Sequence, residues 1–66
     1  MTYVYQVKGS EDGTIAICGS RQRAIKRAIE YVEQQDLKFI RSENSLGDVS
    51  LYGANLSAYV EKWWLE

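Results

Sequence analysis

The chain has 66 residues, and its eight Lys and Arg against nine Asp and Glu give a net charge of −1 at neutral pH. This near-balance argues against a protein that coats nucleic acid by charge alone, and equally against a strongly acidic mimic of DNA. The sequence holds no histidine and one cysteine, Cys18, which excludes an internal disulfide and the ordinary zinc sites. Such a short chain with so few reactive groups leaves little room for an active site, so we expect no enzymatic activity, cofactor or metal.

The chain begins with a predicted β-hairpin. Two β-rich runs, over residues 3–8 and 14–18, are separated by a turn that contains two glycines. Because successive side chains of a strand point to opposite faces, we expect Ile15 and Ile17 on one face and Ala16 and Cys18 on the other. Cys18 has no histidine to act as its base, so we interpret it as a small core residue and not as a nucleophile.

A change of spacing after residue 20 predicts an amphipathic helix over residues 21–35. Its apolar stripe follows the i, i+3, i+4, i+7 pattern and consists of Ile25, Ala28, Ile29 and Val32. The opposite side is a solvated ridge that holds Arg23, Arg27, Glu30 and Gln34, with Lys26 beside them. Lys26 and Glu30 are spaced to form an ion pair along the helix. We expect the cations of this ridge, Arg23, Lys26 and Arg27, to contact a partner macromolecule.

The start of this helix contradicts the usual charge preference. Ser20 is a good N-cap, yet the residues behind it include four cations, at the end where the helix dipole favours anions. One interpretation is an anion site at Gly19, Ser20 and Arg21, where free backbone N–H groups hold a phosphate or carboxylate. The other is a capped helix with a solvated basic face. Arg21 lies on the apolar side of the helix, so it is the cation for which we most expect a specific partner.

Three more β-strands are predicted after the helix. Residues 37–41 and 49–52 form two of them, joined by a polar turn over residues 43–48. Residues 56–65 fit either a helical stripe or a strand, and we favour the strand because strand-forming residues are frequent there. The predicted fold is therefore a single α+β domain over residues 1–66, with the order ββαβββ and one helix packed on a mainly antiparallel sheet.

One helix cannot cover five strands, so the second face of the sheet is a candidate surface for oligomerisation or for a partner. Trp63 and Trp64 cannot both face inward on a strand, so one of them should lie on the open face, near Tyr59 or Tyr52. Tyr and Trp often anchor interfaces, and we expect Tyr59, Trp63 and Trp64 to bind a partner. A core of this size rarely supplies more than ~3–5 kcal/mol, which favours a homodimer.

The remaining acidic residues and the overall hydropathy indicate no further site. Glu11, Asp12, Glu43 and Asp48 lie in predicted turns, and neither turn matches the calcium-loop pattern. The sequence shows no secretory signal and no apolar run long enough for a membrane span. Together with the lack of disulfides, this indicates a cytoplasmic protein without membrane association.

Several short features of the chain occur in a fixed order. They are Tyr3-Val4-Tyr5 in the first strand, Gly13 in the turn, Ser20-Arg21 with Ala24 and Ala28 in the helix, and Val60-Glu61-Lys62-Trp63-Trp64 in a late aromatic strand. In this arrangement the chain resembles the small uncharacterised proteins of bacteriophage early regions. The resemblance implies a protein of the host cytoplasm that binds and inhibits host proteins, such as an anti-CRISPR or another anti-defence factor, or that sequesters nucleotide signals. It implies no catalytic residue.

Two functions from different classes remain open. The first is a non-enzymatic inhibitor that binds a host or defence-system protein through the open sheet face and the basic helix ridge. The second is a binder that recognises the phosphate of a nucleotide signal or nucleic acid at Ser20 and Arg21, with a Tyr or Trp stacked on a base. The near-neutral net charge and the acidic C-terminal third favour the first.

Overall fold

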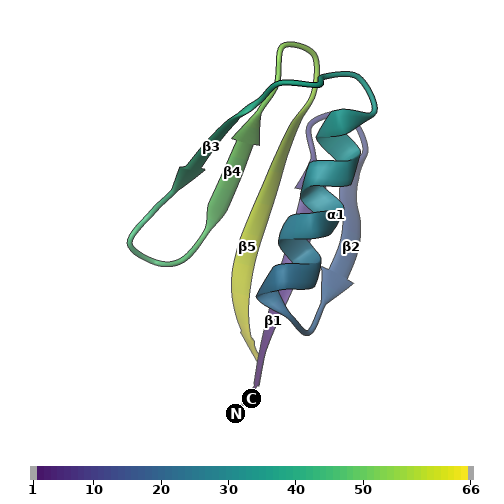
Figure 1. The fold of residues 1–66 in the computed structure, drawn as a ribbon. Coiled ribbons are helices and arrows are strands. Elements are labelled where there is room, and N and C mark those ends of the chain that lie inside the picture. The colour runs from purple at the N-terminus through teal and green to yellow at the C-terminus, as the bar shows by residue number, and fades with distance from the viewer. Residues whose placement is uncertain (1, 66) are drawn as a thin grey trace.

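The computed structural model describes residues 2–65, with the side chains of residues 3–64. Its elements, in chain order, are β1 (Thr2–Gly9), β2 (Gly13–Cys18), α1 (Arg21–Glu33), β3 (Ile40–Glu43), β4 (Val49–Tyr52) and β5 (Ser57–Leu65). The strands form one antiparallel sheet in the order β2-β1-β5-β4-β3, and α1 lies on one face of it (Figure 1). The predicted α+β fold and its ββαβββ order are confirmed, including the strand at the C-terminal end.

The sheet is organised around the pair formed by β1 and β5. These strands pair without interruption from Thr2 opposite Leu65 to Gly9 opposite Ala58, so the two ends of the chain lie side by side in Figure 1. Alternation along β5 then assigns each side chain to a face. Ala58 and Val60 point toward α1 and are buried, whereas Tyr59 and Glu61 point to the face that α1 leaves open.

The core fills the layer between α1 and the sheet. From the helix it takes Ala24, Ile25, Ala28, Tyr31 and Val32, and from the rest of the chain Val7, Val49, Leu51, Leu56, Ala58 and Val60. The predicted stripe is therefore confirmed for three of its members, and Ile29 is only partly buried beside them. Within the described residues, no helix has the length and apolar character needed to cross a membrane.

The predicted alternation in β2 is wrong at Ile15. Ala16 pairs with Val7 and Thr14 with Lys8, so Ile15 is an extra residue without an opposite partner, as in a β-bulge. The bulge shifts the alternation by one position. Ile15 therefore packs against the core on the same side as Ala16 and Cys18, while Ile17 points away and is largely exposed.

The strand predicted over residues 37–41 begins later than expected. Leu37 is 90% exposed and lies outside the sheet, and β3 starts only at Ile40. Phe39 packs against the core from the segment between α1 and β3. The backbone of Asp36 is still held by the end of the helix, since its N–H donates to the Val32 carbonyl at 2.9 Å. Residues 37–39 then connect this last turn to β3, so the first three residues of the predicted strand lie in the connection.

Asp36 joins the end of the helix to the turn before β5. Its carboxylate accepts the backbone N–H groups of Asn55, at 3.0 Å, and of Leu56, at 2.9 Å, as well as the side-chain amide of Asn55 at 2.9 Å. These hydrogen bonds, the one from Leu56 above all, hold the pKa of Asp36 below its usual value, although burial of the carboxyl opposes them. Asp36 is thus a structural residue, and no pattern in the sequence singles it out.

Candidate protein-binding surfaces

The start of α1 has the predicted cap. Ser20 has extended backbone angles, φ −122° and ψ 133°, and its hydroxyl oxygen accepts the Arg23 N–H at 3.5 Å. The first turn of the helix contains no acidic side chain. Ser20 therefore caps the helix as predicted. Gly19, Ser20 and Arg21 lie together at the first turn.

Arg21 has a partner within the chain. Its Nη2 donates to Glu43 Oε1 at 2.6 Å, and Nη2 of Arg41 donates to the same oxygen at 3.0 Å. The two guanidinium groups, with that of Arg41 contributing most, lower the pKa of Glu43. A phosphate at the start of the helix would have to compete with Glu43 for Arg21, which weighs against the anion-site interpretation.

The Glu43 pair gives a first testable expectation. Glu43→Gln should reduce the midpoint of thermal unfolding only slightly, because the ion pair is exposed and screened by water. The difference from the parent protein should disappear in 1 M NaCl, where the Debye length falls to about 3 Å. Scanning calorimetry at low and high salt measures both effects. A difference that persists at high salt would mean that the amide itself, and not the lost charge, disturbs the packing of β3.

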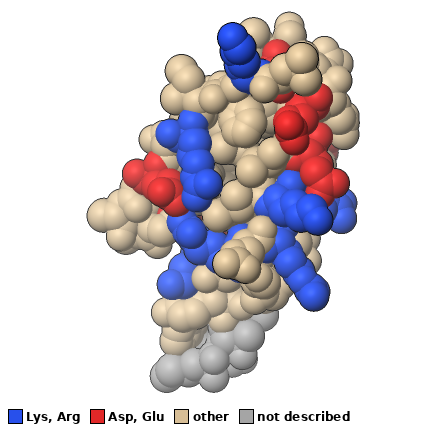
Figure 2. Space-filling view, in the orientation of Figure 1, with Lys and Arg blue, Asp and Glu red and all other residues tan. Residues whose placement is uncertain are grey.

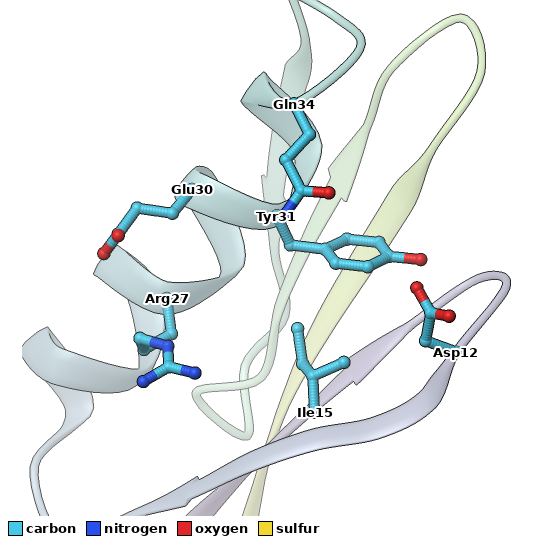
Figure 3. A pocket seen from close by; sticks show the side chains of 6 residues that line it. All are labelled: Asp12, Ile15, Arg27, Glu30, Tyr31 and Gln34. Carbon is cyan, nitrogen blue, oxygen red and sulfur yellow. The ribbon is translucent and has the colours of Figure 1, made fainter.

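A groove runs along the outer edge of the sheet, between β2 and α1. Its upper part has a volume of about 480 Å³ and is lined by Asp12, Ile15, Arg27, Glu30, Tyr31 and Gln34. Figure 3 shows the Tyr31 ring reaching from α1 across this part toward Asp12 in the β1–β2 turn. The lower part has a volume of about 410 Å³ and is lined by Ile17, Cys18, Gly19, Arg23, Lys26, Arg27 and Glu30. Both hollows have Arg27 and Glu30 in their lining, so they lie next to each other along α1, and together we call them the β2–α1 groove.

The predicted basic ridge forms one wall of this groove. Arg23, Lys26 and Arg27 are all exposed, and among the described ion pairs none involves them. The ion pair expected between Lys26 and Glu30 does not form. Figure 2 shows basic side chains over the lower part of this flank and acidic ones above them. The three cations are therefore available to an outside partner.

The face of the sheet opposite α1 is uncovered and carries several large apolar side chains. Ile17 is 66% exposed, Trp63 49%, Tyr52 44% and Ile40 71%. Tyr59 stands between them and meets the Tyr52 ring edge-on, with 6.1 Å between the centroids. The register places these residues on β2, β5, β4 and β3, so the apolar side chains are distributed over the whole width of this open face.

Trp64 lies on the other side of the sheet from Trp63. It stands opposite Tyr3 and contacts its ring edge-on at 4.5 Å between centroids, while Lys62 Nζ lies 3.9 Å above the Tyr3 ring. The predicted split of the two tryptophans between the faces is thus confirmed. The partner-binding residues predicted from the sequence consequently fall on three surfaces: Tyr59 and Trp63 on the open face, Trp64 with Tyr3, and the three cations along the groove.

Two other sequence features have structural explanations. Cys18 is partly buried, packs against the core and lines the lower end of the groove. In the turn between β3 and β4, the side-chain oxygen of Asn44 accepts the N–H groups of Leu46 and Asp48, at 2.9 and 3.0 Å, and these bonds organise the turn. Over the part of the chain that the structure describes, no three acidic, cysteine or histidine side chains cluster as metal ligands would.

Comparison with known proteins adds no relative. No family model matches this chain, and no curated protein or solved structure matches it either.

Proposed function

We propose that this protein is a non-enzymatic binding module that acts by occupying another protein, in the manner of an inhibitor of a host or defence-system protein. The observation that carries the proposal is the open face of the sheet. Four large apolar side chains are exposed there, although a domain of this size has few such residues to spare from its core. Trp and Tyr on such a face are the side chain types that contribute most to interfaces.

The polar groups of the open face support an interface better than they support a catalytic site. Lys8 and Glu61 are paired at 3.4 Å, and the Gln6 side chain donates to the Thr14 hydroxyl at 2.7 Å. Groups that already pair with one another lose less when they are covered than unpaired groups do, because part of their hydrogen-bonding capacity stays filled. We expect Trp63 to be the anchor of the contact, with Ile17 and Tyr59 as further apolar contacts on the same face.

The phosphate-binding alternative receives less support. Arg21, the cation closest to the helix start on the sheet side, is engaged by Glu43, and the other three basic side chains of the helix line a groove that also holds acids. The phage-type role belongs to the same proposal and is supported by the resemblance of the sequence to small phage early-region proteins.

The proposal is tested by capture and inhibition together. The tagged protein should retain one bacterial protein in a fixed ratio and suppress the activity of that protein when purified. Trp63→Ser should weaken capture at least about tenfold, as expected for an interface anchor. Leu37→Ser is the control, because Leu37 is a large apolar residue that is even more exposed than Trp63 but lies outside the sheet.

Sedimentation analysis decides whether a second copy covers the face instead. A dimer that Trp63→Ser converts to a monomer would assign the open face to self-association, and the inhibitor would then have to bind through another surface. Equal capture by both serine variants, or capture without loss of the captured protein's activity, would refute the proposed function.

A further inference from the structure

The β2–α1 groove has the features of a site for an added β-strand. β2 stands at the end of the sheet order and pairs only with β1 among the described strands. Alternate N–H and C=O groups of an edge strand point away from its neighbour and can pair with an incoming chain. An extended peptide that joins such an edge gains backbone hydrogen bonds. The side chains of the protein around the edge determine which peptide side chains fit.

The helix supplies the wall that makes this edge different from the opposite one. α1 packs against β1, β2, β4 and β5, whereas β3, at the other end of the sheet, meets the helix through the Arg21–Glu43 ion pair and all its residues are exposed. A strand added to β3 would have one neighbour only. A strand added to β2 would have β2 on one side. On its helix-facing side it would meet the α1 side chains that line the groove described above.

The β-bulge restricts the usable part of the edge to its lower half. Ile15 interrupts the regular ladder, whereas Ala16, Ile17 and Cys18 pair regularly with β1. Bulges of this kind protect edge strands from indiscriminate pairing. Gly19 follows the last residue of β2, and a Cβ built on it would meet no atom within 4 Å, so a neighbouring chain has room there. A segment of about four residues can therefore align with residues 16–19.

The charges of the groove select the chemistry of that segment. Arg23, Lys26 and Arg27 line the lower half, and Glu30 is the single acid there. Asp12 and Glu30 line the upper half, where Arg27 is the single cation. A partner segment complements both halves of the groove if its acidic residues lie beside residues 16–19 of this protein and it has none beside the upper half.

We propose that the β2–α1 groove binds an extended acidic segment of a partner protein as an added strand on the free edge of β2. The inference rests on the proposed function, because it supplies a second contact for the same kind of partner. It needs neither Trp63 nor the open face. The two claims can therefore fail separately.

The test uses two synthetic octapeptides, EDEVTVTV and its reversal VTVTVEDE, and for each the neutral version in which Glu and Asp become Gln and Asn. We expect one acidic peptide to bind at least about tenfold more tightly than its neutral version, since three exposed ion pairs of moderate strength together give this ratio. Preference for EDEVTVTV would indicate antiparallel addition to β2, because its acidic end would then lie beside Cys18. Preference for the reversal would indicate parallel addition.

Three readouts separate strand addition from simple attraction to the helix. Arg23→Gln/Arg27→Gln should remove most of the preference for the acidic peptide, whereas Trp63→Ser should leave it unchanged. Hydrogen exchange at the amides of residues 16–19 should slow in the complex. Alkylation of Cys18, the single cysteine, should slow as well, because this side chain lines the occupied end.

The proposal is overturned if the acidic and neutral peptides bind equally, or if the peptide binds without protecting the amides of residues 16–19. It is also overturned if a single-stranded oligonucleotide competes for the same arginines with a steep salt dependence while neither peptide binds, because the cations would then belong to a nucleic-acid site. If the peptides do not bind but a protein is still captured through the Trp63 surface, the strand-addition proposal fails and the proposed function is retained.

Discussion

Gly9→Ala should remove most of the stability of this domain. Gly9 is buried near the end of β1, and a Cβ built on it would overlap the ring of Tyr31 at three carbon atoms. Overpacking of this kind costs about 1–3 kcal/mol, occasionally more, in a domain whose whole stability is on the order of 3–5 kcal/mol. Urea unfolding followed by circular dichroism measures the loss.

The ring cannot easily move to make room. Tyr31 comes from the buried side of α1, and its hydroxyl accepts the Glu11 N–H at 3.3 Å across the β1–β2 turn. Gly19→Ala is the matched control, since its added methyl group meets nothing, and it should change the free energy of unfolding by less than about 0.5 kcal/mol. Tyr31→Leu should restore part of the stability lost in Gly9→Ala. If Gly9→Ala and Gly19→Ala unfold at the same urea concentration, the close packing of Gly9 against Tyr31 contributes nothing.

The fold could be predicted from the sequence where the signal is local and repeated. The helix has an apolar stripe and a Ser20 cap, and both are present as expected. The β-rich composition of the last residues correctly favoured a strand over a helix. In each of these cases several neighbouring residues carry the same preference, so the error at any one position matters little.

The features that could not be predicted depend on contacts between distant residues. The bulge at Ile15 moves one side chain to the other face, and nothing in the alternation of residues 14–18 announces it. The packing of Tyr31 on Gly9 and the carboxylate of Asp36 at the turn before β5 join segments about twenty residues apart. Such contacts arise only once the sheet and helix have been assembled.

The candidate site was predicted residue by residue but not as a surface. Arg23, Lys26 and Arg27 were expected on an exposed ridge, which is confirmed, yet their place beside the free edge of β2 follows from the strand order. That order puts β5 between β1 and β4 and leaves β2 at the outside. The sequence predicts five strands without indicating which of them become edges, and the groove depends on this choice.

Asp36→Asn should be the most destabilising acid-to-amide substitution in the chain. Both carboxylate oxygens of Asp36 accept hydrogen bonds from Asn55, and one of them also accepts the Leu56 N–H. An amide would place an N–H donor against these donors. It has no space to turn aside, because Gly53 lies directly against the carboxylate. Asp12→Asn, in an exposed turn, is the matched control and should unfold like the parent protein.

The same carboxylate should make the stability of the domain depend on pH in the acid range. The pKa of Asp36 is lowered in the folded state from its usual value of 3.8, chiefly by the hydrogen bond from Leu56. A carboxyl group with a depressed folded pKa stabilises the protein fully above the unfolded pKa, and this contribution is lost as the pH falls through the folded value. Between about pH 5 and 8, the usual range of maximal stability, titration of Asp36 should leave the free energy of unfolding of the parent protein unchanged. Below about pH 4 the free energy of unfolding should fall progressively.

Urea unfolding at a series of pH values measures this loss, and two variants apportion it. Glu43 also has a lowered pKa, caused by Arg41 and Arg21, so it adds to the acid sensitivity with the same sign. Glu43→Gln should remove its share of the pH dependence with little change in stability at neutral pH. Asp36→Asn should reduce the dependence further, because the group that titrates against Leu56 and Asn55 is gone. An unchanged acid profile in Asp36→Asn would show that the carboxylate is equally protonated in the folded and unfolded chains, and that its hydrogen bonds do not favour the charged form.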